Sequence, residues 1–88
     1  MEPTYLADIT EKDYAAFFRL PGNEFPNTFN LWWQGRQNQV ALYSEGGGKI
    51  VFVKAYADEF ARYCAARGSA HDANAFSKYI YEKGRGKI

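Results

Sequence analysis

The sequence has little cysteine, no long apolar run and no excess charge of either sign. Cys64 is the only cysteine among 88 residues, so the chain cannot form an intramolecular disulfide. One cysteine and one histidine, His71, are too few for a thiolate-based zinc site. No stretch approaches the roughly 18 apolar residues of a membrane span, and acidic residues interrupt the region where a signal peptide is apolar. These absences predict a cytoplasmic protein without metal, cofactor or membrane.

The charge balance excludes two further classes of protein. Eleven basic and ten acidic residues give a net charge of +1, so neither an acidic nucleic-acid mimic nor a strongly basic DNA-coating protein is indicated. The charges are unevenly placed, because residues 1–24 hold five acidic and two basic side chains, whereas residues 77–88 hold one acidic and four basic. The chain therefore begins acidic and ends basic, and residues 84–88 are expected to form a flexible basic tail.

Aromatic residues, in contrast, are abundant, with two Trp, seven Tyr and seven Phe in a length that fits one domain, residues 1–88. This composition excludes a disordered chain. The core must be thin, because a domain of this size buries only roughly two thirds of its unfolded surface. Nine aromatic residues are predicted to lie in the core: Tyr14, Phe17, Phe18, Phe29, Phe52, Phe60, Tyr63, Phe76 and Tyr79. The other seven aromatic residues are more than such a core obviously needs.

The hydrophobic pattern predicts a small, mostly helical α+β domain with a two-stranded sheet. Helices are expected at residues 11–19, 28–45, 57–67 and 73–83. Residues 49–55 are β-branched and apolar on both faces, which predicts a strand buried on both sides, with residues 4–7 as its partner. The open edges of so small a sheet can be covered by a second copy of the chain, so a homodimer is one expected arrangement.

Residues 28–45 fit two structures. As a helix, the segment begins at the N-cap residue Thr28, and its aromatic residues share one face with Arg36. As strands, it folds back onto residues 50–53, which gives a three-stranded antiparallel meander over residues 28–55 with helices on one face. We prefer the helix, because the Gln-, Asn- and Arg-rich centre makes a poor turn, although Gly35 costs a helix about 1 kcal/mol.

No group of residues points to catalysis. A Cys64–His71 dyad needs an orienting third group such as Asp72 or Asn74, and Cys64 falls on the inner face of a predicted helix, where cysteine packs as a small hydrophobe. The carboxylates are scattered, and Gly46–Gly48 precede a strand, whereas a phosphate-binding loop follows a strand and opens a helix. The sequence therefore predicts no catalytic residue and no metal ligand, and hence a protein that is not an enzyme.

The predicted protein-binding site is Trp32, Trp33, Arg36 and Tyr43. Adjacent tryptophans lie about 100° apart on a helix, so they cannot both be central to a buried stripe. Trp, Tyr and Arg are enriched in binding hot spots, although a thin core also gains area from large side chains. Small free-standing domains often serve as inhibitors or adaptors of larger bacterial or phage complexes. We therefore predict a non-enzymatic interaction protein that binds a larger protein.

The C-terminal helix pair, residues 58–87, supports an alternative function, DNA or RNA binding. Two helices joined by a turn at residues 68–71 have helix-turn-helix proportions, and the outer face of the second is polar and basic. Against this reading, Asn74 lies six residues after the turn glycine, where a typical helix-turn-helix motif has an apolar residue. The predicted nucleic-acid contacts are Asn74, Ser77, Lys78, Tyr81, Arg85 and Lys87.

Overall fold

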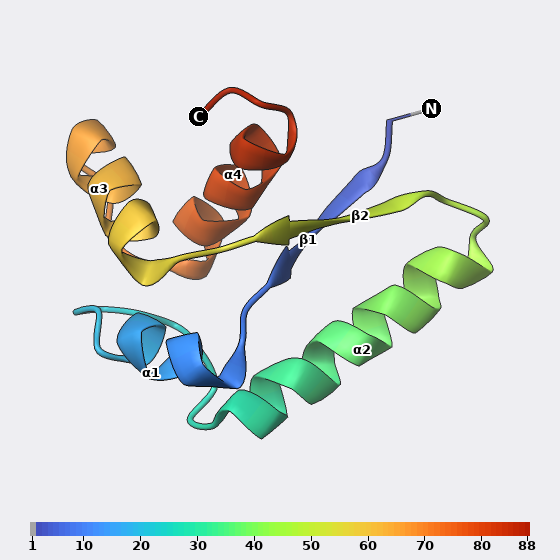
Figure 1. Ribbon diagram of the computed structural model, residues 1–88, viewed down its shortest axis with the longest axis horizontal. Helices are drawn as coiled ribbons and strands as arrows, with labels where there is room; N and C mark the ends of the chain where they lie inside the picture. The colour runs from blue at the N-terminus through green and yellow to red at the C-terminus, as the bar shows by residue number, and fades with distance from the viewer. Residues whose placement is uncertain (1) are drawn as a thin grey trace.

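A computed structural model describes residues 2–88, which form four helices and a two-stranded parallel sheet (Figure 1). The molecule is flat, with extents of 36 × 29 × 19 Å. The predicted small α+β fold is confirmed. In chain order its elements are β1 (Thr4–Asp8), α1 (Glu11–Phe18), α2 (Phe29–Glu45), β2 (Ile50–Lys54), α3 (Ala57–Arg67) and α4 (Ala73–Gly84).

The two strands run in parallel, with Thr4 opposite Ile50 and Asp8 opposite Lys54. Parallel strands cannot be joined by a tight turn and need a long crossover connection. Helices α1 and α2 supply this connection, so the chain crosses from β1 to β2 through the two helices. The strand predicted at residues 4–7 is thus the partner of β2.

The antiparallel meander over residues 28–55 was the wrong alternative, because α2 is a continuous helix. Thr28 begins this helix, and its hydroxyl oxygen accepts a hydrogen bond from the Leu31 amide at 3.2 Å. This cap satisfies one of the free N–H groups at the helix start. Gly35 lies within the helix without ending it.

Side chains also fix the ends of the other helices. The hydroxyl oxygen of Thr10 accepts from the Asp13 amide at 3.2 Å at the start of α1, and the Asp72 carboxylate accepts from the Ala75 amide at 2.8 Å at the start of α4. Gly68 ends α3 with a φ of 63°, a left-handed conformation that favours glycine. Local sequence therefore accounts for the bounds of these helices.

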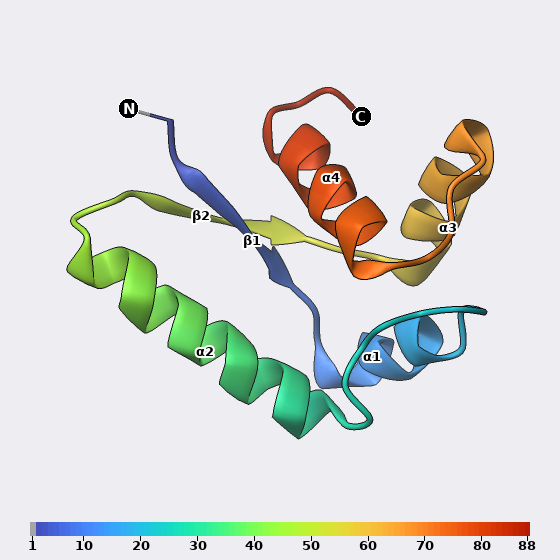
Figure 2. The ribbon, with the colours of Figure 1, turned by 180° about the vertical axis from the view of Figure 1, so that it is seen from behind.

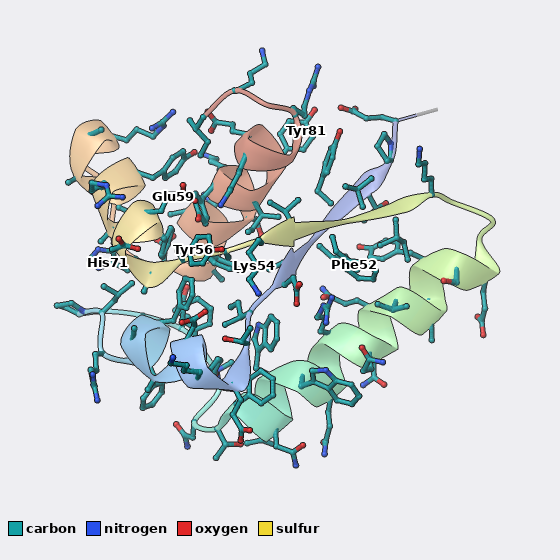
Figure 3. All side chains as sticks on the ribbon, in the orientation of Figure 1. Phe52, Lys54, Tyr56, Glu59, His71 and Tyr81 are labelled. Atoms are coloured by element: carbon teal, nitrogen blue, oxygen red, sulfur yellow. The ribbon has the colours of Figure 1, made fainter. Side chains whose placement is uncertain are left out.

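The sheet lies between α4 on one face and α2 on the other (Figures 1 and 2). On the first face, Tyr5 packs against Gly84 and Tyr81 of α4, and the rings of the two tyrosines are 5.8 Å apart. On the second face, the ring of Phe52 lies 4.5 Å from the guanidinium carbon of Arg36 on α2. Figure 3 shows Phe52 on the side of β2 that faces α2.

The hydrophobic core lies between the sheet, α1, α3 and α4. Phe17, Phe60 and Tyr79 are fully buried at its centre. The rings of Phe17 and Phe60 are 6.3 Å apart, and those of Phe60 and Tyr79 are 5.4 Å apart. Helix α2 adds only the partly buried Phe29 and Trp32 to this core.

Two aromatic residues predicted for the core are exposed. Phe18 lies at the end of α1, and 41% of its surface is accessible. Phe52 is 51% accessible, because α2 covers its face of the sheet only in part. The prediction that residues 49–55 are buried on both sides is therefore wrong, and Val53 and Ala55 are the buried residues of this segment.

Candidate interaction site

Helix α2 is the least buried element of the described chain: none of its 17 residues is buried. Leu31 and Leu42 lie eleven residues apart, about three turns, and so on the same side of the helix, whereas Trp33 lies on another side. A helix with apolar side chains around its circumference is usually covered on more than one side. The large exposed side chains, which we call the α2 surface, are Leu31 (52% accessible), Trp33 (41%), Leu42 (66%) and Tyr43 (39%).

The four residues of the predicted protein-binding site lie on two parts of α2. Trp32 and Arg36 face the body of the domain and are partly buried, whereas Trp33 and Tyr43 are exposed. The ring of Trp32 packs 6.1 Å from that of Tyr14, and the guanidinium carbon of Arg36 lies 5.9 Å from Trp32. The two tryptophans therefore point different ways.

Arg36 is largely buried without a full set of partners. Its side chain is 13% accessible, and the nearest carboxylate oxygen, on Asp8, is 4.0 Å from Nη2, which is a long ion pair. Its Nε is closed to solvent and has no hydrogen-bond partner among residues 2–88. A buried N–H without an acceptor costs about 1–3 kcal/mol. A ligand can reach the guanidinium only at its Nη atoms, and Nη2 has only the long contact with Asp8.

A groove of about 400 Å³ runs along the outer edge of β1. Residues 5–7 of β1 line it between two walls, and this volume is within the range of about 300–1,000 Å³ that is usual for ligand sites. One wall belongs to α2, and the other to α4 with residues 24–26 before α2. We call this feature the β1 groove. Three distant segments build it, so no local pattern in the sequence reveals it.

The basic C-terminus is partly neutralised by the acidic N-terminus. The guanidinium of Arg85 lies 3.0 Å from the Glu2 carboxylate, which also accepts a hydrogen bond from the Tyr81 hydroxyl at 2.7 Å. Arg85 itself stacks over the ring of Tyr81, with 5.3 Å between the guanidinium carbon and the ring centre. Two of the residues predicted to contact nucleic acid thus already have partners within the chain.

The remaining residues predicted to contact nucleic acid, Asn74, Ser77, Lys78 and Lys87, are exposed. Ser77 lines the β1 groove, whereas Asn74 and Lys78 line a second hollow between α3 and α4. Lys87 lies beyond the end of α4, and its amide donates to the carbonyl oxygen of Glu82 at 2.9 Å. Asn74, Ser77, Lys78 and Tyr81 share one exposed side of α4, because they lie three, four and seven residues apart on the helix.

Cys64 and His71 have separate partners. The thiol of Cys64 is buried and donates to the Ala70 carbonyl oxygen at 3.6 Å. The Nδ1 atom of His71 lies 2.9 Å from the carbonyl oxygen of Pro21, and its ring packs on Phe60. Among residues 2–88, no hydrogen bond joins the two side chains, and the contacts of each are those of a structural residue.

A polar cluster that the sequence analysis did not find joins α3, α4 and the end of β2 (Figure 3). Lys83 donates to the Glu59 carboxylate and, at 2.6 Å, to the Lys54 carbonyl oxygen. The Tyr79 hydroxyl donates to Glu59 and accepts from the Tyr56 amide. Burial opposes ionisation of Glu59, but the hydrogen bonds from Lys83 and Tyr79 outweigh it and lower the pKa of the carboxyl. The cluster therefore fastens both helices to β2.

Residues 2–88 hold no group of three or more His, Cys, Asp or Glu side chains placed to bind a metal ion. In the same part of the chain, no helix is both long and apolar enough to cross a membrane. No protein family, curated protein or solved structure matches this chain.

Proposed function

We propose that the protein is a non-enzymatic interaction protein that binds a larger protein, as an adaptor or inhibitor, through α2. The observation that carries the proposal is the exposure of the α2 surface. Full burial of one large apolar side chain stabilises a protein by about 1.5–3 kcal/mol. In a chain of 88 residues this gain is large compared with the total stability. A partner that covers α2 supplies the burial that the domain itself does not.

The surroundings of α2 support the same proposal. The guanidinium of Arg36 has only a long contact with Asp8, at 4.0 Å, and the β1 groove lies along one side of the helix. Arginine and tryptophan with apolar neighbours are typical of the residues that dominate binding energy. The single cysteine is a free thiol, in keeping with the reducing cytoplasm that we propose as the location.

The proposal is tested by affinity capture from nuclease-treated lysate. Trp33→Ala and Leu42→Ala are expected to weaken capture of the partner at least tenfold, which is the effect of about 1.4 kcal/mol. Phe18→Ala is the matched control, because Phe18 is as exposed as Trp33 but lies on α1. Circular dichroism of each variant checks that the fold is kept.

Two outcomes would contradict the proposal. If both α2 variants capture the partner as well as the wild type does, α2 is not the binding surface. Binding to duplex DNA that falls steeply with salt, and is lost in the double variant Lys78→Ala and Lys87→Ala, would instead support the nucleic-acid alternative. The exposure of these two lysines is what keeps that alternative open to test.

A further inference from the structure

We infer that the β1 groove binds an extended segment of the partner, which joins the sheet as a third strand and brings a carboxylate to Arg36. The inference rests on the proposed function and names the mode of binding. It combines three features of the described residues: an unpaired strand edge, apolar walls on both sides of that edge, and a largely buried guanidinium whose contact with its nearest carboxylate is as long as 4.0 Å.

The hydrogen-bond pattern of β1 shows which groups are free. The Thr4 amide donates to the Lys49 carbonyl oxygen at 2.9 Å, and the Asp8 carbonyl oxygen accepts from the Ala55 amide at 3.1 Å. Alternate residues of a strand bond to opposite sides, so the amides and carbonyls of residues 5 and 7 point away from β2. Within residues 2–88, β1 pairs with β2 alone, and no other hydrogen bond engages the main-chain groups of residues 5 and 7. The edge therefore presents two donors and two acceptors at the spacing of a strand.

The opposite edge of the sheet is partly closed. The carbonyl of Lys54 on the outer side of β2 accepts a hydrogen bond from the ammonium group of Lys83. Lys49 and Lys54 also flank this edge, and lysines at a sheet edge discourage the addition of further strands. Tyr5, Leu6 and Ala7 on β1 carry no charge, and a groove runs beside them. The β1 edge is therefore the one suited to receive a strand.

The walls of the groove fit the alternating side chains of a strand. Successive side chains of a strand point to opposite faces, so a strand added at β1 contacts α2 with one set and α4 with the other. Leu31 and Trp32 line the α2 wall, and Phe76 and Ile80 line the α4 wall. Both walls favour apolar side chains in the bound segment.

The charged side chains of the groove predict one feature of the bound segment. The carboxylates of Glu24 and Asp72 line the groove, but each already accepts a backbone amide at the start of α4, from Ala73 and Ala75 respectively. Arg36 is the cation of the lining, and its Nη2 has only the long contact with Asp8 at 4.0 Å. Hydrogen bonds between arginine and a carboxylate are among the strongest in proteins. The bound segment therefore carries an Asp or Glu opposite Arg36.

The groove favours a single segment over a second copy of the chain. It has helices on both sides of the edge, so only a narrow extended chain reaches β1. A second copy pairing through its own β1 would bring another α2 and α4 to the same place. The second copy is thus an outcome that the experiment must detect.

The probe is the peptide acetyl-TVEVT-amide, titrated into the full 15N-labelled chain and followed by NMR. We expect the amides of Tyr5 and Ala7 to shift and to gain protection from exchange. The analogue with Gln in place of Glu should bind at least fivefold more weakly. In the Arg36→Gln variant the two peptides should bind equally, whereas Arg62→Gln, an exposed arginine on α3, should keep the preference.

A second variant tests the main-chain contacts. Ala7→Pro removes an amide that points to the groove and leaves the bonds to β2, and proline is tolerated at such edge positions. This variant should bind the peptide at least tenfold more weakly. If it does not fold, N-methylation of the peptide removes the same bonds from the other side and should have the same effect.

Three results overturn the inference: no shift at β1 at about 1 mM peptide, equal binding of the Glu and Gln peptides to the wild type, or pairing of two copies through β1. Partner capture separates this inference from the proposed function. If Trp33→Ala abolishes capture of the partner and Ala7→Pro leaves it unchanged, only the strand inference is overturned. Capture that does not depend on α2 overturns the proposed function.

Discussion

Gly84 illustrates how one side chain, or its absence, decides a contact. It lies in the last turn of α4, where a Cβ atom would overlap the ring of Tyr5. Tyr5 belongs to β1, so this close approach sets the distance between α4 and the sheet. The ring also packs edge-on against Tyr81, which holds it in place.

We therefore predict that Gly84→Ala destabilises the protein by about 1–3 kcal/mol, the usual cost of overpacking. The opposite sign would be expected from helix propensity alone, because alanine is better than glycine in a helix by about 1 kcal/mol. The measurement is the free energy of unfolding in urea.

Gly35→Ala is the matched control within α2. A Cβ at Gly35 meets no atom within 4 Å, so this variant should gain about 0.5–1 kcal/mol from helix propensity. If both variants gain stability, the contact between Gly84 and Tyr5 does not constrain the fold.

Among the elements, α3 and α4 are joined by a polar contact at their outer ends. Tyr63 on α3 donates to the Glu82 carboxylate on α4, which also pairs with Arg67 at 3.0 Å. The guanidinium carbon of Arg67 lies 3.8 Å from the centre of the Tyr63 ring. Burial and, after it, the hydrogen bond to Glu82 raise the pKa of Tyr63 from 10.0 to about 12.

This shift predicts how stability changes at alkaline pH. The folded protein favours the neutral phenol, so the contribution of Tyr63 is complete below pH 10 and is lost as the pH rises from 10 to about 12. Tyr63→Phe should therefore lose less stability than the wild type between pH 9 and pH 11 in urea unfolding. Tyr56→Phe, at an exposed tyrosine, should follow the wild type. Equal slopes for Tyr63→Phe and the wild type would refute the assignment.

The sequence predicts most elements because their signals are local. Thr28 and Asp72 cap α2 and α4, and Gly68 ends α3, so the bounds follow from single residues and their neighbours. The burial of a strand depends instead on what covers it. Phe52 is exposed although its strand is apolar on both faces. Its burial depends on whether another element covers that face of the sheet, which the pattern within the strand does not show.

The candidate site was predictable only in part, for the same reason. Helical spacing separates Trp32 from Trp33, and the structure places the first inward and the second outward. The sequence pattern does not reveal the β1 groove, because the free groups of the groove are backbone amides and carbonyls. The incomplete pairing of Arg36 appears only when β1 and β2 lie beside α2.

At the scale of the whole molecule, the domain has two unequal parts. The sheet, α1, α3 and α4 enclose the core, whereas α2 lies against the sheet and α1 without a buried residue (Figure 2). Segments with few buried apolar contacts open locally at less free energy than the core. The two parts should therefore differ in stability within one folded molecule.

Hydrogen exchange of the full chain checks this expectation. We predict that the amides of α2 exchange at least 100-fold faster than those of α4, equal to about 2.7 kcal/mol in opening free energy. Phe17→Ala should cost about 3–5 kcal/mol of global stability, whereas Trp33→Ala should change it by less than about 0.5 kcal/mol. Equal exchange of α2 and α4 would show that the molecule opens as one unit.

The hydrogen bond from Lys83 to the Lys54 carbonyl has a consequence for stoichiometry. A two-stranded sheet with two open edges would pair with a strand on each side, and repeated pairing of this kind would build a filament. With the β2 edge partly closed, the sheet accepts a strand on one side only. Each molecule then binds one partner segment, and the complex does not grow further.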